Sequence, residues 1–360
     1  MIAEDVNRTM NQITGVGDEA VVTTPNRTEK IAGEKKVSNL KHLLETNIVA
    51  ADIRWSIFVA ACQSYRFDSC LKPYPNQFVT DGNKNIDALR EVVDKTKSFS
   101  LLLKKIEEPN FYRGNEDIID LLHWLLIELP EPKFKNIPKK EFDFVMKLVP
   151  SEVATEAPNL IFQMVWSPES SSEMKWNDFT KKYGTFFAFH GSRLENFHSI
   201  LHYGLQQHMN KNSLFGKGIY LSSELTVSLP YSPSGYGWGR SIHGSELSCV
   251  AVCEIINHPD VKCQDKDSDP SRSITTDSIG GKVPNKYYLV VNSDLVRVRY
   301  LLVYCKETPY RVGSGAISWL RNHKVLVFIM SYLVMLAAIG AYHNPHAQRW
   351  WKILLRKFNL

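Results

Sequence analysis

Apolar residues recur at helical spacing through the first part of the chain. They stand three or four positions apart at Leu40, Leu43, Leu44, Ile48 and Ala51. This spacing predicts a helix with one buried face. Further helices are predicted over 86–93, over 115–126 with Asn115 as the N-cap, and over 140–148. The pattern therefore predicts an all-helical domain over residues 38–150.

After residue 157 the apolar residues form short runs rich in β-branched and aromatic side chains, which are typical of strands. The runs lie at 160–166, 185–190, 218–221, 248–255, 287–291 and 296–304. One helix is predicted between them, over 193–202, and the polar stretch at 264–284 is predicted to be a loop. Many strands with few helices predict an α+β domain of split antiparallel sheets over residues 151–310.

A third pattern lies near the C-terminus, where residues 325–342 contain no charged side chain. As a helix this segment spans about 27 Å, close to the hydrocarbon thickness of a bilayer. A buried core helix is the alternative, but the segment follows the last predicted strand, and Trp350 and Trp351 stand beyond it as interfacial aromatics do. We expect a single C-terminal transmembrane helix that acts as a tail anchor, with a lumenal tail at 343–360.

The expected membrane follows from the same segment. A span so near the end of the chain inserts after synthesis, which leaves the body in the cytosol. The length and apolarity of the span favour the endoplasmic reticulum membrane, with the nuclear envelope as a second location. The flanking lysines and arginines are balanced on the two sides, so they do not decide the orientation.

Composition narrows the remaining choices. The 360 residues are 44% hydrophobic, which is enough for a sizeable core, and their net charge is +5. They contain no basic block of the kind that binds nucleic acid.

Residues 1–37 are polar and mixed in charge, which predicts a disordered arm. The six cysteines form no C-x-x-C pair, so reduced thiols are expected. Cys249 and Cys253 fall within a strand-like run, which favours buried thiols over a zinc site, and no metal is predicted.

One spacing of residues carries candidate chemistry. Phe189-His190-Gly191-Ser192 ends a predicted strand, and Tyr220 opens another one thirty residues after the histidine. Ser228 and Tyr231 follow Tyr220 by eight and eleven residues. A glycine allows close approach to the main chain, and an aromatic ring can stack on a planar ligand. Each residue alone would be an ordinary core or rim residue, so the joint spacing carries the prediction.

These residues resemble the poly(ADP-ribose) polymerase superfamily, with its diphtheria-toxin-like ADP-ribosyltransferase fold, and within it the tail-anchored type that transfers one unit. His190 and Tyr220 match the first two positions of the family triad. The third position is a glutamate in the polymerising members, thirteen residues before the tyrosine of a Lys-Tyr-Leu-Leu-like strand. Counting back from Tyr300 reaches Tyr287. The resemblance therefore implies transfer of a single ADP-ribose unit.

The resemblance also implies roles and partners. NAD is the substrate, with His190, Tyr220 and Tyr287 catalytic. The residues implied to bind NAD are His190, Gly191, Ser192, Tyr220, Ser228 and Tyr231. Nicotinamide is expected to stack between Tyr220 and Tyr231 while His190 orients the adenosine ribose. The implied acceptors are proteins near the endoplasmic reticulum membrane, including stress-sensing kinases, nuclear transport factors and the protein itself, with a role in the unfolded protein response and no need for nucleic acid.

Two other functions are compatible with these patterns. A membrane-anchored scaffold that binds NAD with little catalysis is suggested by Tyr287. An NAD-dependent RNA 2′-phosphotransferase shares the expected fold, but it needs basic residues that grip a phosphate within the site. Labelling with NAD distinguishes the first alternative, and salt-sensitive RNA binding distinguishes the second.

Overall fold

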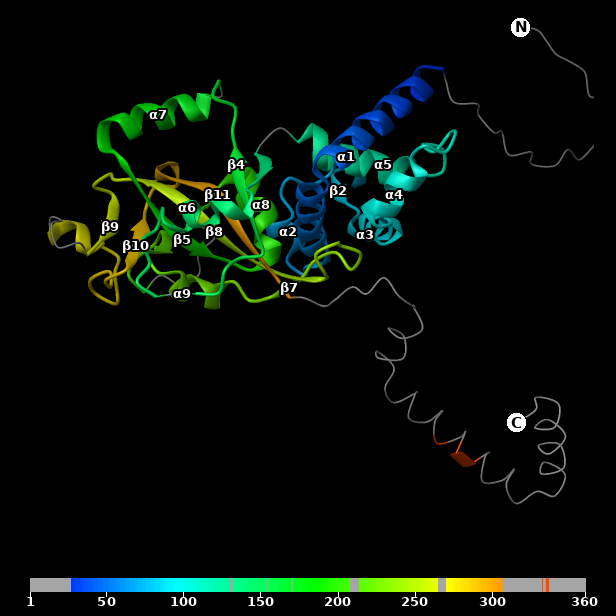
Figure 1. Cartoon of the computed structure of the whole chain (residues 1–360). Coiled ribbons are helices and arrows are strands. Elements are labelled where there is room, and N and C mark those ends of the chain that lie inside the picture. The colour runs from blue at the N-terminus through cyan, green and yellow to red at the C-terminus, as the bar shows by residue number, and fades with distance from the viewer. Residues whose placement is uncertain are drawn as a thin grey trace, which may run out of the picture. The chain divides into compact units, whose positions relative to one another are not determined.

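The computed structural model describes residues 27–129, 132–153, 155–169, 171–207, 214–264 and 270–306, and beyond them only Tyr332, Met335 and Leu336. The chain divides into two units, residues 1–308 and 309–360, and the first contains the helices and the sheet labelled in Figure 1. Among the described residues, no helix has the length and apolar character of a membrane span. The predicted anchor and lumenal tail lie outside the described residues, apart from the three named.

The longest helix, α1 (Arg27–Gln63), begins eleven residues before the predicted start. Its first turns were expected to belong to the arm because they are polar. They are helical where Gly33 packs against the ring of Tyr112, which leaves no room there for a Cβ atom. The rest of the predicted arm, residues 1–26, lies outside the described part of the chain.

Asn47 interrupts α1 with non-helical dihedral angles, φ −151° and ψ 56°. Its side-chain oxygen accepts a hydrogen bond from the N–H of Ala50 at 3.3 Å, so it caps the second half of the helix. The shorter helices of this part are α2 (Phe67–Cys70), α3 (Ile86–Lys95), α4 (Phe99–Lys105), α5 (Glu116–His123), the π-helix Trp124–Glu128 and α6 (Phe142–Met146).

Asn115 occupies the N-cap position of α5 as predicted, but it makes no capping bond. Its amide group donates instead to the carbonyl oxygen of Phe111 at 2.9 Å. The predicted side-chain cap is therefore wrong, because the amide is engaged by the preceding turn.

The helical part also contains strands that the sequence did not predict. Strands β1 (Val79–Thr80) and β2 (Asn83–Lys84) form a hairpin around Asp81 and Gly82, whose φ angles are 50° and 77°. Strand β3 (Lys133–Asn136) leaves the helices and pairs with the first strand of the large sheet.

The large sheet is antiparallel, in the order β3-β4-β11-β8-β5-β6-β10-β9, with β7 paired to β8. Its further strands are β4 (Leu160–Val165), β5 (Thr185–Gly191), β6 (Ile219–Ser222), β7 (Gly235–Tyr236), β8 (Glu246–Ile256), β9 (Val261–Cys263), β10 (Tyr287–Val290) and β11 (Val296–Cys305). All six predicted strands are present within two residues of their expected ends. The antiparallel arrangement is confirmed.

The sheet is nearly divided between β5 and β6. These strands share a single residue pair, Phe189 with Ser222. Beyond it, His190 and Gly191 pair only with β8, and residues 219–221 pair only with β10. The two halves of the sheet therefore separate where the predicted site residues lie.

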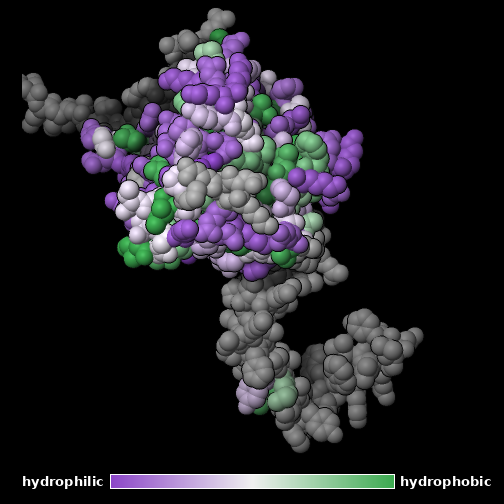
Figure 2. Space-filling model, turned by 90° about the vertical axis from the view of Figure 1, so that its left-hand side faces the viewer, coloured by the Kyte–Doolittle hydropathy of each residue, from purple (hydrophilic) through white to green (hydrophobic). Residues whose placement is uncertain are grey.

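Helices cover the sheet, with α7 (Ser171–Tyr183), α8 (Phe197–Tyr203) and the single turn α9 (Leu225–Ser228) following β4, β5 and β6. Single 3₁₀ turns lie at Asn76–Phe78, Lys139–Glu141, Leu194–Asn196, Leu229–Tyr231, Pro270–Ser273 and Ser293–Leu295. The face shown in Figure 2 carries both hydrophilic and hydrophobic residues, each kind in several small groups. In the interior, the apolar side chains form three buried clusters.

Helix α1 belongs to two cores. Trp55 and Phe58 lie in the core of the helical part, whereas Ile53 and Ile57 pack with the sheet. Strand β8 alternates in the same way, with Cys249 and Cys253 on this face of the sheet and the valines between them on the other. None of the six cysteines, all of which lie in the described part of the chain, forms a disulfide bond, and burial raises the pKa of the Cys249 and Cys253 thiols.

Candidate active site

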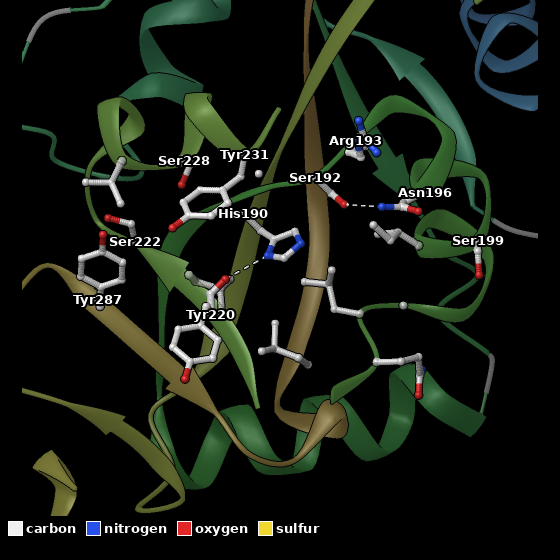
Figure 3. Close-up of a pocket in the computed structure, with 18 of the residues that line it drawn as sticks. His190, Ser192, Arg193, Asn196, Ser199, Tyr220, Ser222, Ser228, Tyr231 and Tyr287 are labelled. Atoms are coloured by element: carbon white, nitrogen blue, oxygen red, sulfur yellow. Dashed lines mark hydrogen bonds between the residues drawn. The ribbon is translucent and has the colours of Figure 1, made fainter. Parts of the chain in front are cut away.

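A cavity of about 1210 Å³ lies where β5 separates from β6. Every residue that the sequence singled out for catalysis or NAD binding lines it. They are His190, Gly191, Ser192, Tyr220, Ser228, Tyr231 and Tyr287. Figure 3 shows the rings of Tyr231 and Tyr220 to the left of His190, with Tyr287 farther to the left. The fold thus brings together residues from β5, β6, β10 and the turn after β6.

His190 is fixed as a neutral hydrogen-bond acceptor. Its Nδ1 lies 2.9 Å from the carbonyl oxygen of Tyr220. Because a carbonyl only accepts, Nδ1 carries the proton and Nε2 keeps its lone pair. Burial lowers the pKa of His190, partly offset by the bond to Tyr220. The imidazole can therefore accept a hydrogen bond from a ligand hydroxyl at neutral pH.

Tyr220 is held by the loop that precedes its strand. Its hydroxyl donates to the carbonyl oxygen of Gly216 at 2.8 Å and accepts from the N–H of Phe215 at 3.0 Å. Burial raises the pKa of this phenol. These two bonds hold the Tyr220 ring in place in the cavity wall.

The loop before Tyr220 is hydrogen-bonded to a second loop that contains Thr275 and Asp277. The Thr275 hydroxyl donates to Phe215 O at 2.8 Å, and Asp277 Oδ2 accepts from the N–H of Lys217 at 2.9 Å. Gly216 has φ 111°, and a Cβ atom there would stand 2.1 Å from Thr275 Oγ1. The two loops are therefore packed as one unit behind Tyr220. Residues 208–213 of the first loop lie outside the described residues.

Gly191 is required by packing within the protein. A Cβ atom there would lie 2.0 Å from the carbonyl oxygen of Ser228 and 3.0 Å from the Cβ atom of Tyr231. The sequence prediction explained this glycine by the approach of a ligand ring, whereas the contact shown is with the Ser228 turn. The Ser228 hydroxyl donates to Phe189 O at 3.3 Å, which leaves its oxygen able to accept.

Ser192 is engaged on both its main chain and its side chain. Its N–H donates to Ser232 Oγ at 3.0 Å, and its hydroxyl oxygen accepts from Asn196 Nδ2 at 3.0 Å. The bond from Asn196 leaves the hydroxyl hydrogen of Ser192 able to donate. Asn196 also lines the cavity and was missed by the sequence prediction.

Tyr287 lies opposite Ser222 on the neighbouring strand. None of the described residues that line the cavity carries a carboxylate. Glu224 follows two residues after Ser222, but it is 3% exposed and its carboxylate accepts from Ser151 Oγ at 2.6 Å and contacts Lys286 at 3.3 Å. The glutamate of polymerising enzymes has no substitute within this lining.

The helical part supplies a wall of the cavity that the sequence did not predict. Its residues are Tyr65, Arg66, Ser69 and Cys70. These come from the turn between α1 and α2 and from α2, more than a hundred positions before His190, so no local pattern connects them with the site. Among the described residues, no group of three or more histidine, cysteine or carboxylate side chains is placed to hold a metal ion.

Comparison with known proteins identifies the family. Residues 139–306 match the poly(ADP-ribose) polymerase catalytic domain, and residues 42–126 match the ARTD15 N-terminal domain. The chain is 38% identical over 311 residues to protein mono-ADP-ribosyltransferase PARP16 of Homo sapiens, which covers 85% of this chain and 94% of the relative. The Mus musculus protein of the same name is 37% identical over 319 residues, 86% of this chain and 95% of the relative.

A further relative matches a smaller share of the chain. Protein mono-ADP-ribosyltransferase PARP8 of Mus musculus is 30% identical over 131 residues, 28% of this chain and 15% of that protein. The likeness to the PARP16 proteins, by contrast, extends over both the helical part and the sheet. The chain therefore belongs to the poly(ADP-ribose) polymerase family and is a protein mono-ADP-ribosyltransferase that uses NAD as its substrate.

Proposed function

We propose that this enzyme breaks NAD in the cavity between β5 and β6 and attaches one ADP-ribose unit to proteins at the endoplasmic reticulum membrane, itself included. The observation that carries the proposal is the meeting of seven predicted residues in one cavity whose described lining has no carboxylate. The residue roles, the membrane and the acceptors are each part of the proposal.

The nicotinamide end is assigned to the side of the cavity with Tyr220 and Tyr231. Tyr220 has a fixed ring, and Tyr231 stands at the mouth, 59% exposed and free to cover a planar ligand. Main-chain groups of Gly191 and the oxygen of Ser228 hold the carboxamide, because the Ser228 hydroxyl hydrogen is already directed to Phe189. Stacking adds about 1 kcal/mol beyond the area buried.

His190 orients a ribose hydroxyl through Nε2, since Nδ1 is bonded to Tyr220. NAD supplies the reactive glycosidic bond: its electron pair leaves with nicotinamide, the acceptor atom bonds to the ribose carbon, and the acceptor proton passes to solvent. The residues of this chain contribute by positioning and by electrostatic stabilisation. Tyr287 provides no charge to activate a ribose hydroxyl for elongation, which favours transfer of one unit.

Residues 325–342 are proposed to anchor the enzyme in the endoplasmic reticulum membrane or the nuclear envelope. The uncharged stretch and its flanking tryptophans support this. Anchoring raises the effective concentration of membrane proteins around the site. We therefore propose acceptors among membrane-associated proteins, such as stress-sensing kinases and nuclear transport factors, with a role in the unfolded protein response.

The scaffold and the RNA 2′-phosphotransferase are the two alternatives to this proposal. The second needs basic residues in the site, and Arg66 and Arg193 do line the cavity. The names of the relatives favour protein modification over RNA chemistry.

The catalytic proposal is tested with the full-length chain in membranes and NAD labelled on its adenylate. Label is expected on the wild type and absent from a His190→Ala, Tyr220→Ala double variant. A wild type that binds NAD but incorporates no label would establish the scaffold instead.

The membrane proposal is tested by fractionating cells that express the full chain or a chain ending at residue 324. The full chain is expected to stay with endoplasmic reticulum membranes after alkaline extraction, and the shortened chain to be released. Retention of both, or release of both, would contradict an anchor at 325–342.

A further inference from the structure

We propose that Tyr65 and Arg66, at the junction of α1 and α2, bind the ADP portion of NAD. The inference rests on the proposed function, because it assigns nicotinamide to the Tyr220 side of the same cavity. It makes the helical part a contributor to substrate binding. The chemical group that these two residues would recognise is adenosine diphosphate.

The α1–α2 junction lies beside the element that follows His190. His198 on α8 contacts the carbonyl oxygen of Pro73 through Nε2 at 2.9 Å, and its ring lies 5.3 Å from that of Phe58 on α1. His198 is 2% exposed. These contacts fix the junction next to α8, which carries the cavity residue Ser199.

Charge favours a diphosphate at this end. The described lining contains two arginines, Arg66 and Arg193, and no acidic side chain. Arg193 has one acidic neighbour, Glu195, at 3.9 Å. A guanidinium group matches the geometry and charge of phosphate oxygens.

Arg66 is positioned by its main chain, which leaves its side chain available. Its N–H donates to Ser64 Oγ at 3.1 Å, and its carbonyl accepts from Ser69 Oγ at 2.9 Å. These bonds hold the turn without engaging the guanidinium. The neighbouring Tyr65 ring is 84% exposed, and an exposed ring beside a basic group is a surface on which a nucleobase can stack.

The two ends of the cavity have different chemistry. In Figure 3, Arg193, Asn196 and Ser199 lie on the other side of His190 from Tyr287. The Tyr287 side offers aromatic rings, whereas the Arg193 side offers charged and polar groups. NAD has an uncharged carboxamide at one end and two phosphates with a polar nucleoside towards the other, which matches this division.

The test compares full-length wild type with Arg66→Gln, measuring kcat, the KM for NAD and the inhibition constants of two ligands. ADP-ribose contains the diphosphate and adenosine, and nicotinamide contains neither. Arg66→Gln is expected to raise the KM for NAD and the inhibition constant of ADP-ribose about tenfold. The inhibition constant of nicotinamide and kcat should change less than about twofold, and Arg66→Lys should recover part of the loss.

Arg113→Gln is the matched control, because Arg113 is an exposed arginine outside the cavity lining. It should leave all four constants unchanged. Tyr65→Ala should weaken the binding of ADP-ribose, because the nucleobase loses its stacking surface. The binding of nicotinamide should not change.

Three results would overturn the inference. If the inhibition constant of ADP-ribose is unchanged in Arg66→Gln, then Arg66 does not contact the ADP group. If the binding of ADP-ribose and nicotinamide weakens in parallel, the substitution has changed the fold. A higher KM for a protein acceptor alone assigns Arg66 to acceptor docking. Failure of the proposed function itself is distinguishable, because then the wild type would show no turnover of NAD.

Discussion

His190 is the residue whose protonation state decides how the cavity treats a sugar hydroxyl. Burial lowers its pKa from the ordinary value of 6.5. Nε2 therefore keeps its lone pair at neutral pH and loses it only under more acidic conditions. We predict that kcat/KM for NAD has an acid limb whose midpoint lies below pH 6.5, measured from about pH 5 to about pH 8.

The same residue gives a direct substitution test. His190→Ala should lower kcat/KM by about a hundredfold, because the ribose loses its orienting group. His42→Ala, at an exposed histidine of α1, is the matched control and should retain wild-type activity. An acid limb centred above pH 6.5 and absent from His190→Ala would contradict the assignment of a neutral imidazole.

Gly191 makes a prediction about packing. An alanine there places Cβ 2.0 Å from Ser228 O, so the turn that carries Ser228 and Tyr231 must move. We expect a KM for NAD raised about tenfold or more and a loss of about 1–3 kcal/mol in unfolding free energy. Gly239→Ala, where a Cβ meets nothing within 4 Å, should change neither quantity. Wild-type KM in Gly191→Ala would show that the turn does not shape the site.

The site residues that were predicted from the sequence differ from those that were missed in how they come to line the cavity. His190, Tyr220 and Tyr287 belong to three strands in the order β5-β6-β10, and their spacing along the chain already matched a family pattern. Arg66 reaches the cavity only through the packing of α1 and α2 against α8. Such a contact depends on tertiary structure, which no motif around Arg66 records.

Among the elements, the long apolar strands of the sheet were predicted, whereas short helices such as α4 and elements on polar edges were not. Strands β8 and β11 are long apolar runs in the middle of the sheet. Helix α7 was missed because most of its side chains are polar, with Trp176 its one buried hydrophobic residue. Strand β3, Lys133–Asn136, is an edge strand with one aromatic residue, Phe134. The β1–β2 hairpin had a usable signal in Asp81-Gly82, a pair that favours tight hairpin turns.

The loop after Tyr231 ties the site to the helical part. Trp238 is 2% exposed within the helical core, with its ring 4.8 Å from that of Phe99. Arg240 donates to the carbonyl oxygens of Asp94 at 2.8 Å and Thr96 at 3.0 Å. The residue that covers the cavity mouth is thus connected through a short loop to the helical core.

Asp52 of α1 holds the end of this loop and gives a prediction about stability. Its carboxylate accepts from the Ser241 hydroxyl and from the N–H of Ile242, and burial raises its pKa to about 6. The unfolded chain ionises this group near its ordinary value of 3.8. Folding stability therefore falls as the pH rises from about 4 to about 6, by about 2–3 kcal/mol in total.

Asp52→Asn removes this ionisation and tests the sign. The unfolding free energy of the wild type, relative to Asp52→Asn, should decrease between about pH 4 and about pH 7. Asp178→Asn is the control, since its side chain is 80% exposed, and it should show no comparable change. A wild type that gains stability over Asp52→Asn with rising pH would contradict a raised pKa.

At the scale of the whole molecule, the helical part and the sheet are joined around α1. One side of this helix packs in the helical core and another packs on the sheet. The sequence predicted helices before strands in the correct order, but not that α1 would serve both cores, nor that the helical part would line the cavity. Both features arise from contacts between residues far apart in the chain.

The central claim is that this cavity transfers one ADP-ribose unit and does not extend it. The most direct measurement is the number of ADP-ribose units at each modified residue, determined by mass spectrometry after the full-length enzyme has reacted with NAD. We expect one unit at every site, because Tyr287 replaces the glutamate and no carboxylate stands in the described lining. Chains of two or more units would contradict it.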